Sequence, residues 1–315
     1  MRVALFGGTG FVGSYIIDAL LADGHTPVAL VRPGSDGKVR HSDHCITVPG
    51  DIDDNAAVAA TLRDCDAAIY LIGILREDPD AGITFNALQF AGAKHCIDVA
   101  RKLGVPRFLL MSANGVHADG TAYQRSKFKA EQYLADSGLD GTVFRPSVIY
   151  GDPRGRMEFC TQLLEQMIEP PIPAPAFFKG LLPGRGGFSM SPVHVEDVAQ
   201  AFIRSLGDSR CVGQVYALGG SETLSWPQII RRIAVAAGRR KLIVPAPAFG
   251  VRLACLLFDR FAWFPLTRDQ LTMLLEGNAV ASRSAFAALD IEERGFSRDD
   301  LAYLSDGGRE LQGSV

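Results

Sequence analysis

A tyrosine and a lysine stand four residues apart in the segment Tyr123-Gln124-Arg125-Ser126-Lys127. On a helix, residues with this spacing lie on one face, about one turn apart. Free tyrosine titrates at about pH 10, so a neighbouring cation would be needed for proton transfer near neutrality. The pair therefore indicates general acid–base chemistry. The simpler alternative is an amphipathic helix with a solvated lysine.

Polar residues also end the strand that precedes this helix. A strand is predicted at Arg107–Ser112, which runs into Ser112-Ala113-Asn114, and a helix is predicted at Tyr123–Ser137. A serine or asparagine at such a strand end could donate a hydrogen bond to a substrate carbonyl. The candidate catalytic residues are therefore Ser112, Tyr123 and Lys127.

A glycine-rich turn lies between an apolar strand at Arg2–Phe6 and a helix at Phe11–Ala22. Its glycines allow a tight turn, leave the backbone bare and permit close packing of the helix on the strand. Free amides at the helix start can then hold a pyrophosphate. A turn that serves packing only is the alternative. The predicted dinucleotide site comprises Gly7, Thr9, Gly10, Phe11, Val12 and Gly13.

The end of the second predicted strand, Pro27–Val31, bears on the choice of cofactor. In this kind of site an acid binds the 2′-hydroxyl of NAD, whereas an arginine accommodates the 2′-phosphate of NADP. Arg32 follows the strand, with Lys38 and Arg40 nearby. NADP(H) is therefore favoured over NAD(H). Both stay open, because a solvated basic loop has the same composition.

A carboxylate follows the third predicted strand, Cys45–Val48. Asp51, with Ile52 after it, could accept a hydrogen bond from the adenine amino group of the cofactor. Capping of the next helix by Asp53 or Asp54 explains part of this acidity equally well. Asp51 and Ile52 are thus candidate cofactor contacts.

Strand and helix patterns alternate through the first half of the chain. This order predicts an α/β fold, a Rossmann-type doubly wound parallel sheet with helices on both faces. Ile72 ends the fourth strand, and the long loop from Gly73 to Thr84 that follows it would border the cofactor, so Ile72 and Gly73 are candidate cofactor contacts. The remaining predicted elements are strands Ala67–Ile72 and Thr142–Phe144 and helices Asn55–Arg63 and Asn86–Leu103.

The order loosens after Pro146. Prolines cluster from Pro170 to Pro175, and glycines follow at positions 184, 186 and 187, which indicates a mobile loop or the start of a second lobe. We expect residues 1–150 to form the dinucleotide-binding domain, joined by further strands and helices from residues 190–235. Residues 151–189 and 236–315 would form a smaller, mostly helical substrate lobe.

Composition limits the classes of partner. The chain has 315 residues, of which 47% are apolar and 21% charged, and a formal net charge of -3. These values are ordinary for a soluble protein, and the absence of a basic block argues against a nucleic-acid partner. The six cysteines are scattered without metal-ligand spacing, and His41 and His44 have no partner that completes a site. No metal is therefore expected.

The cysteine pattern also indicates reduced thiols and a cytoplasmic protein. The first strand begins at residue 2, which leaves no room for a leader in front of it. No stretch approaches the roughly 18 uninterrupted apolar residues of a membrane span. We therefore expect no transmembrane segment.

In their order, these motifs resemble the short-chain dehydrogenase/reductase superfamily, in its extended or atypical branch of epimerase/dehydratase type. The resemblance covers residues 1–235. It is carried by the glycine turn, Gly50-Asp51-Ile52, Tyr123-x-x-x-Lys127, Arg145-Pro146-Ser147-Val148-Ile149-Tyr150-Gly151 and Val193–Ala199. Two later segments, Tyr216–Ser225 and Leu266–Leu271, are similar to the group that contains the nucleotide-binding accessory subunit of respiratory complex I and its bacterial relatives.

The resemblance implies roles for particular residues. Tyr123 would be the general acid/base, Lys127 its cationic partner and a ligand of the nicotinamide ribose, and Ser112 or a neighbour the carbonyl polariser. Pro146 and Ser147 would lie beside the nicotinamide. Ala113 departs from the family, which usually has a second hydroxyl there. Because Gln124 rather than a carboxylate follows Tyr123, dehydration of a sugar nucleotide is disfavoured.

The expected function is an NADP(H)-binding oxidoreductase or isomerase that acts on a carbonyl or alcohol. The alternative is a non-catalytic NADPH-binding accessory or assembly subunit related to complex I, and a nucleotide-sugar epimerase is a weaker one. The sequence specifies neither the substrate nor the oligomeric state. A hydrophobic small molecule is favoured, with candidate pocket walls at Ile74, Leu75, Phe159, Phe177, Phe178 and Met190.

Three further features have competing interpretations. The apolar run Leu242–Leu266 predicts a pair of packed helices, and the alternatives are a substrate wall, a peripheral membrane contact or a docking face for a partner such as complex I. His194 is expected to be a packed, hydrogen-bonded side chain rather than a catalyst. Glu196 and Asp197 are expected to cap a helix at Val198–Leu206.

Overall fold

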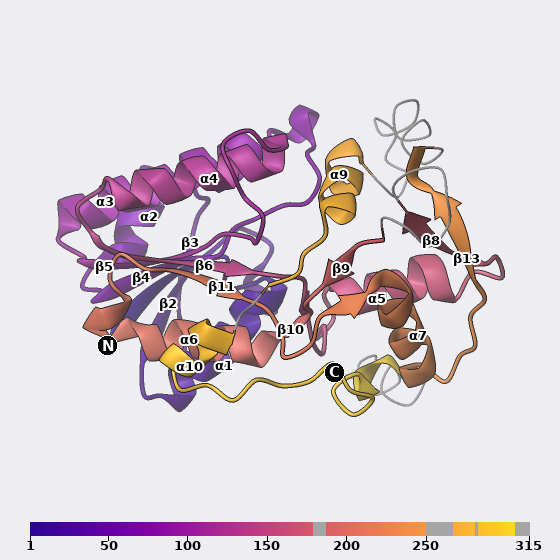
Figure 1. Ribbon diagram of the computed structural model, residues 1–315. Coiled ribbons are helices and arrows are strands. Elements are labelled where there is room, and N and C mark those ends of the chain that lie inside the picture. Colours follow the sequence, from indigo (N-terminus) through magenta and orange to yellow (C-terminus); the bar gives the residue numbers. More distant parts are fainter. Residues whose placement is uncertain (179–186, 250–266, 281–282, 306–315) are drawn as a thin grey trace. The chain divides into compact units, whose positions relative to one another are not determined.

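The computed structural model describes residues 1–178, 187–249, 267–280 and 283–305 (Figure 1). The chain divides into two compact units. The first consists of Met1–Pro146, Val195–Leu218 and Ala285–Ile291, and the second of Ser147–His194, Gly219–Ser284 and Glu292–Val315.

The first unit contains a seven-stranded sheet in which every pairing is parallel, in the order β11-β6-β5-β4-β1-β2-β3. Its central strands are apolar and buried on both faces, as parallel strands covered by helices must be. The predicted fold class is confirmed. The strands are β1 (Arg2–Phe6), β2 (Thr26–Val31), β3 (Ile46–Pro49), β4 (Ala67–Tyr70), β5 (Arg107–Met111), β6 (Asp140–Pro146) and β11 (Val215–Leu218).

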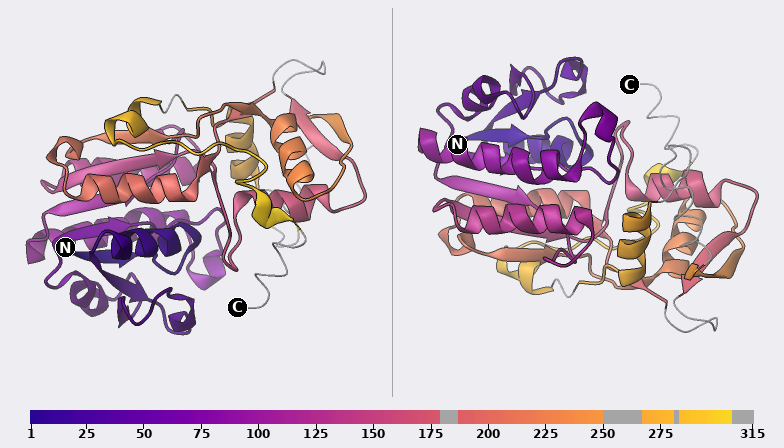
Figure 2. Two further views of the ribbon diagram at one scale, coloured as in Figure 1. Left: turned by 90° about the horizontal axis from the view of Figure 1, so that it is seen from below. Right: turned by 90° about the horizontal axis from the view of Figure 1, so that it is seen from above.

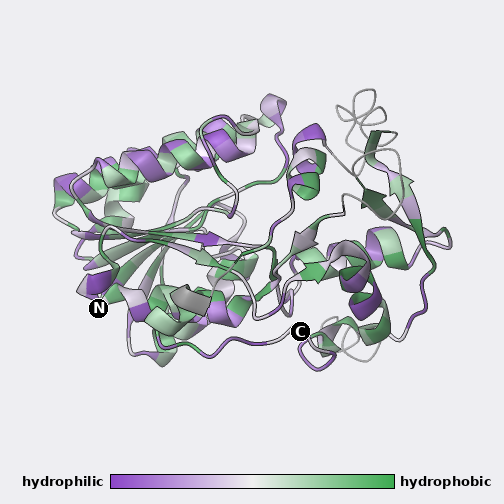
Figure 3. Cartoon of the chain, in the orientation of Figure 1, coloured by the Kyte–Doolittle hydropathy of each residue, from purple (hydrophilic) through white to green (hydrophobic). Residues whose placement is uncertain are grey.

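Helices cover both faces of this sheet (Figures 1 and 2). On one face lie α2 (Asn55–Leu62), α3 (Gly92–Leu103) and α4 (Ala122–Ala135), and on the other α1 (Phe11–Ala22) packs against α6 (Val195–Leu206). The helices alternate hydrophobic and hydrophilic positions, whereas the central strands are largely hydrophobic (Figure 3). Short elements complete the unit: η1 (Asp36–Lys38), η2 (Pro79–Ala81), η5 (Ser209–Cys211) and α10 (Arg283–Ala288).

Two predicted helices differ in detail from the structure. The helix predicted at Asn86–Leu103 begins as a π-helix, η3 (Asn86–Ala91), and continues as α3. The helix predicted at Val198–Leu206 begins at Val195, so the interpretation of Glu196 and Asp197 as caps is wrong. Both acids lie inside the first turn, where their negative charges interact favourably with the partial positive charge of the helix N-terminus.

In its described residues, the second unit contains three two-stranded sheets and short helices. Its strand pairs are β7 (Ile149–Tyr150) with β10 (Val193–His194), β9 (Ser189–Met190) with β12 (Leu224–Ser225), and β8 (Ala174–Phe178) with β13 (Ile243–Pro247). Its helices are α5 (Phe159–Leu163), the π-helix η4 (Leu164–Ile168), α7 (Trp226–Ala236), α9 (Arg268–Glu276) and η6 (Ala302–Leu304). Tyr150, Trp226 and Phe296 are among the residues that form its hydrophobic core.

The prediction of packed helices at Leu242–Leu266 is wrong for Ile243–Pro247, which is strand β13. This strand pairs in parallel with β8, and its two prolines are tolerated because a two-stranded sheet leaves one side of each strand without a ladder. The rest of the run, from residue 250 onward, lies outside the described residues. The proline cluster before β8 likewise leads into a strand rather than only a loop, and Gly184 and Gly186 lie outside the described residues.

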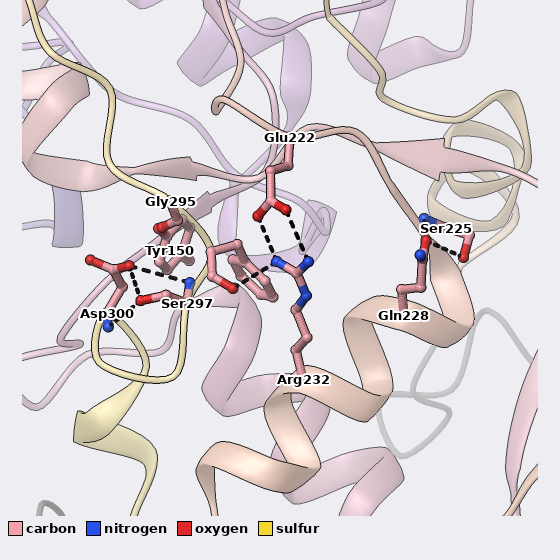
Figure 4. A network of polar contacts seen from close by, with 9 residues as sticks. Tyr150, Glu222, Ser225, Gln228, Arg232, Gly295, Ser297 and Asp300 are labelled. Atoms are coloured by element: carbon pink, nitrogen blue, oxygen red, sulfur yellow. Dashed lines mark hydrogen bonds and ion pairs between the residues drawn. The ribbon is translucent and has the colours of Figure 1, made fainter.

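Polar contacts join α7 to the segment after residue 292 within the second unit (Figure 4). Arg232 binds both carboxylate oxygens of Glu222, at 2.5 and 2.9 Å, and donates to the carbonyl of Phe296 at 3.0 Å. The guanidinium lowers the pKa of Glu222. The Tyr150 hydroxyl donates to the Gly295 carbonyl. These contacts hold the segment that supplies Phe296 to the core.

His194 is buried, and its ring packs edge-on against Tyr150 at 5.2 Å between centroids. Such packing is typical of a structural histidine. Among the helices of the described residues, none combines the length and the apolar composition needed to cross a membrane.

Candidate functional site

The glycine turn links β1 to α1 by a compact backbone bend. The Gly10 amide donates to the Gly7 carbonyl at 3.1 Å, and Gly7 has a φ of 98°, a conformation that favours glycine. Gly10 is the N-cap of α1 and offers no capping side chain. The first amides of a helix have no partner within the helix, so this turn presents donors at the end of β1.

Gly10 and Gly13 have different surroundings. A Cβ added at Gly10 would meet only the Gly7 carbonyl oxygen, at 3.3 Å, so the space above this glycine is open. A Cβ at Gly13 would collide with that same oxygen and would lie 2.7 Å from the Gly8 Cα. Gly13 therefore serves close packing, whereas Gly10 leaves the space that a pyrophosphate needs. Thr9 and Phe11 are half-buried beside this space, and Val12 is buried.

Arg32 is exposed at the end of β2, and its side chain makes no hydrogen bond or ion pair with any described residue. Arg40, by contrast, donates to Asp18 at 3.3 Å, and His41 lies 3.2 Å from the same carboxylate. Arg32 thus has its guanidinium available for an anionic ligand, and Arg40 has its charge partly neutralised.

Asp51 follows β3 and is exposed, and one of its carboxylate oxygens accepts from the Ile52 amide at 2.6 Å. Ile52 is buried, and its carbonyl accepts a hydrogen bond from the His95 ring at 2.9 Å when Nδ1 carries the proton. Of the two acids weighed as caps for the next helix, Asp54 holds that position: it accepts from the amides of residues 56 and 57.

The capping of α4 fixes where its functional residues stand. Thr121 accepts from the Gln124 amide, and the Gln124 side chain accepts from the Thr121 amide at 2.8 Å. This capping box places Tyr123 in the first turn and Lys127 in the next. The Lys127 ammonium donates to the Met111 carbonyl at 3.0 Å, at the end of β5.

The end of β4 connects the glycine turn to Lys127. A Cβ added at Gly7 would lie 3.3 Å from Ile72, and a Cβ at Gly73 would lie 3.2 Å from Lys127 Nζ. Ile72 and Gly73, at the end of β4, therefore lie between the glycine turn on one side and Lys127 on the other. The ends of β1, β4 and β5 meet at one edge of the sheet, as parallel strands require.

Ser112 follows β5 with a buried hydroxyl that has no hydrogen-bond partner among the described residues. Its amide donates to the Phe144 carbonyl at 2.7 Å, which fixes the backbone. A buried polar group without a partner costs roughly 1–3 kcal/mol, so such groups are rare and require an explanation. A hydroxyl that hydrogen-bonds a bound molecule is such an explanation.

Tyr123 packs edge-to-face against Phe85, with ring centroids 5.7 Å apart, and its hydroxyl makes no hydrogen bond to a described residue. Burial raises the pKa of Tyr123 to about 12. Burial also lowers the pKa of Lys127 to about 8, and the Glu131 charge opposes this shift.

The expectation that Lys127 lowers the pKa of Tyr123 is wrong for this structure. The ammonium contacts the Met111 carbonyl rather than the phenol, and desolvation dominates at the tyrosine. Tyr123 is consequently protonated near neutral pH, the state of a proton donor.

The sequence did not reveal the polar residues that support this region. Gln89, on the π-helix η3, is buried; its side-chain oxygen accepts from Ser126 at 2.7 Å and its nitrogen donates to the Ile74 carbonyl at 2.8 Å. A π-helical turn often marks a functional site. Glu131 and Arg145 form a further ion pair behind Lys127. Arg145 begins the motif Arg145–Gly151, which gave no indication of this ion pair, and neither Gln89 nor Glu131 belongs to a spacing motif that would have identified it.

Pro146 and Ser147 fall in different units. Pro146 ends β6, and its carbonyl accepts from the Asn114 amide at 2.9 Å. Ser147 begins the second unit, where its hydroxyl donates to the Asn278 carbonyl at 2.7 Å.

The expected pocket walls are also divided. Ile74 and Leu75 follow β4 in the first unit, and Leu75 is 56% exposed. In the second unit Phe178 is buried, and Phe159, Phe177 and Met190 pack in or against the hydrophobic core. Met190 and Phe178 are therefore core residues, whereas Phe159 and Phe177, which are only partly buried, stay candidate pocket walls.

The parallel sheet and the glycine turn define a dinucleotide-binding protein of Rossmann type. A family described as NAD(P)H-binding matches residues 7–169, more than half of the chain. The chain belongs to this NAD(P)H-binding family, and its homologues lie in the extended short-chain dehydrogenase/reductase group.

Three relatives illustrate the range of the group. The chain is 24% identical over 274 residues to the mitochondrial NADH-ubiquinone oxidoreductase 40 kDa subunit of Neurospora crassa, covering 83% of this chain and 67% of that protein. It is 27% identical over 276 residues to the ceramide reductase of Caulobacter vibrioides, covering 84% and 79%. The crystal structure of Thermus thermophilus UDP-glucose 4-epimerase in complex with NAD has the same fold, with a TM-score of 0.71, 20% identity and full coverage of both chains.

Proposed function

We propose that the chain is an NADP(H)-dependent oxidoreductase that acts on the carbonyl or alcohol of a hydrophobic small molecule, with Tyr123 as general acid/base. The observation that carries this proposal is the buried Ser112 hydroxyl, which has no partner in the described part of the chain and lies in the same unit as the protonated Tyr123 and the buried Lys127. A carbonyl oxygen would supply the acceptor that Ser112 lacks.

The cofactor would bind along the edge of the sheet. The amides at the start of α1 and the open space above Gly10 suit its pyrophosphate, and Arg32 suits a 2′-phosphate. The Lys127 ammonium, beside Gly73, would donate to the nicotinamide ribose. When bound, the cofactor supplies the hydride. Asp51 offers its remaining carboxylate oxygen to the adenine.

In the reductive direction, Tyr123 donates its proton to the substrate oxygen as that oxygen becomes an alkoxide. Ser112 donates a hydrogen bond to the same atom and stabilises the developing charge. Lys127 contributes positive charge beside the site. A pKa of about 12 keeps Tyr123 protonated over the whole neutral range, which favours reduction. The similarity to a ceramide reductase supports a hydrophobic carbonyl as substrate.

The direct test follows the nicotinamide absorbance of NADPH with a panel of hydrophobic ketones and quinones. At least one compound should oxidise the cofactor in the presence of the wild-type protein and not in the presence of Tyr123→Phe. Tight NADPH binding without oxidation by any compound of the panel would contradict the proposal.

A second candidate is a subunit that holds NADPH without turnover. The similarity to the complex I 40 kDa subunit over 83% of this chain favours it. For this candidate, NADPH would co-purify with the protein, the protein would be recovered with complex I from its own cells, and Tyr123→Phe would leave that association unchanged.

A further inference from the structure

A buried carboxylate lies one helical turn after Lys127, and the proposed reaction does not use it. Glu131 stands four residues on along α4 and is only 4% exposed. Side chains with this spacing are neighbours, with Cβ atoms about 5–6 Å apart. The negative charge of Glu131 therefore lies close behind the Lys127 ammonium, on the same face of the helix.

Arg145 holds this carboxylate from the sheet. Its Nε donates to one oxygen of Glu131 at 2.9 Å, and its Nη2 donates to the other. A two-pronged contact of this kind fixes both the direction and the position of the carboxylate. Arg145 lies on β6 directly before Pro146, and β6 also pairs with the strand that leads to Ser112. The ion pair thus ties the helix of Tyr123 and Lys127 to the strands that carry Ser112 and Pro146.

Other groups around Lys127 are neutral or engaged elsewhere. From the same helix, Arg125 donates to the Gly120 carbonyl and Lys129 lies over the Phe90 ring at 5.9 Å. From α3, Lys94 and Asp98 pair with each other at 2.6 Å. Tyr123 is uncharged, and β5, η3 and the loop after β4 present the Met111 carbonyl, the Gln89 amide and Gly73. Among the described residues, Glu131 is the charged group that acts on Lys127.

We infer that the Arg145–Glu131 ion pair is a positioning element for Lys127, which keeps the lysine charged over the neutral range and fixes α4 on β6. Glu131 supplies the negative charge that offsets the desolvation of the ammonium. Arg145 orients that carboxylate and partly neutralises it. The inference rests on the proposed function for its consequence in catalysis, but the charge state of Lys127 does not depend on turnover.

The two members of the pair should shift Lys127 in opposite directions. Glu131→Gln keeps the shape of the side chain and removes its charge, so the pKa of Lys127 should fall by about one unit or more. Arg145→Gln removes the cation that partly neutralises Glu131, so the pKa of Lys127 should rise by about half a unit or more. A merely structural role would loosen and hydrate the region in both variants, and the pKa of Lys127 would then rise in both.

The measurement is a pH titration by NMR of protein labelled with ¹³C at the lysine Cε atoms. The Lys127 signal is the one lost in Lys127→Met. The matched control is Asp98→Asn, which breaks the ion pair with Lys94 and a hydrogen bond from Tyr133 of α4 but removes no charge that acts on Lys127, so the Lys127 titration should stay unchanged. Circular dichroism and the unfolding midpoint establish that each variant is folded. If Glu131→Gln does not fold, Arg145→Gln alone still decides, because a fall or no change in the pKa of Lys127 overturns the inference.

A second readout connects the ion pair to the cofactor. The affinity for NADPH should weaken at alkaline pH as Lys127 loses its charge. In Glu131→Gln this loss of affinity should begin at a lower pH, shifted by the same amount as the pKa of Lys127 measured by NMR. If the pKa of Lys127 shifts in opposite directions in the two variants but NADPH affinity does not weaken at alkaline pH, Lys127 lies outside the cofactor site. That result would contradict the proposed function alone. Shifts of the same sign in both variants would overturn the ion-pair inference alone.

Discussion

The glycine turn and the helix of Tyr123 and Lys127 lie in the same unit, yet the turn offers backbone groups to a ligand, whereas the helix offers side chains. The turn presents backbone amides and an open space above Gly10, where a side chain would meet only one carbonyl oxygen. The helix presents side chains whose properties depend on burial and on partners from other elements, such as Glu131 and the Met111 carbonyl. The first region would bind a ligand because no side chain fills the space next to its backbone amides. The second region depends on the charge and protonation of buried side chains.

This difference determines how each region responds to substitution. Added atoms should damage the turn through steric exclusion of a ligand, with little effect on the free protein. At the helix and at the end of β5 before it, removed atoms should change protonation, stability or turnover, because Lys127 and Ser112 are buried. The substitutions below separate the two kinds of response.

The largest effect on cofactor binding is expected at the turn itself. Gly10→Val should lower the affinity for NADPH at least about hundredfold, because loss of two charge-assisted hydrogen bonds costs about 3 kcal/mol or more. Titration calorimetry measures the affinity, and urea unfolding should show a stability near that of the wild type. Gly207→Val, at a site with nothing within 4 Å of an added Cβ, is the control and should bind normally. Normal binding by Gly10→Val would place the phosphate elsewhere.

Lys127 should make stability depend on pH. Its pKa falls from 10.5 to about 8 on folding, so between these values the unfolded chain binds more protons and stability rises with pH. From pH 8 to 10.5 the wild type should gain about 3 kcal/mol relative to Lys127→Met. The difference between the two proteins removes the contributions of the buried thiols and tyrosines, which are common to both. Lys129→Met controls for the loss of a lysine charge. If the difference in unfolding free energy between the wild type and Lys127→Met did not change with pH, Lys127 would not have the lowered pKa that its burial implies.

At Ser112, stability and activity should move in opposite directions. Ser112→Ala removes a buried hydroxyl that has no partner among the residues that the structure describes, so the free protein should become more stable by about 1 kcal/mol. Turnover should fall about tenfold or more, because a hydrogen bond to the reacting oxygen is lost. Ser137→Ala is the control: its hydroxyl donates to the Leu134 carbonyl at 2.6 Å, so this variant should lose stability and keep its turnover. A destabilised Ser112→Ala would indicate that the hydroxyl has a partner.

The smallest effect concerns the choice between cofactors. The wild type should bind NADPH several-fold tighter than NADH, and Arg32→Ala should remove most of this preference, since a hydrogen bond to a charged group contributes about 1.5–3 kcal/mol. Arg40→Ala should change it little, because Arg40 already contacts Asp18. Equal affinities for NADPH and NADH in the wild type would contradict the role of Arg32.

The same contrast explains how far the sequence was informative. The helix at Phe11–Ala22 has the predicted bounds, because an apolar strand, a glycine turn and a helix form a local signal. Strand β13 was missed, since a short apolar run suits a helix or a strand, and β8, which decides between them, lies some 70 residues earlier.

The residues that support Lys127 and Ser126 could not be predicted from the sequence, because their contacts come from elements that are distant in the chain. Gln89 meets Ser126 across 37 positions, and Arg145 meets Glu131 only because β6 lies beneath α4. Burial also reversed the expected direction of the Tyr123 pKa, and burial depends on the tertiary fold rather than on the spacing of Tyr123 and Lys127.

The most direct test of the proposed chemistry is a paired measurement on Tyr123→Phe. The substitution keeps the ring that packs against Phe85 and deletes the proton. NADPH affinity, measured by calorimetry, should stay within about twofold of the wild type, while kcat on any carbonyl that the wild type reduces should fall about 10²–10⁴-fold, the usual contribution of general acid catalysis. Full turnover by Tyr123→Phe on such a substrate would show that another group supplies the proton.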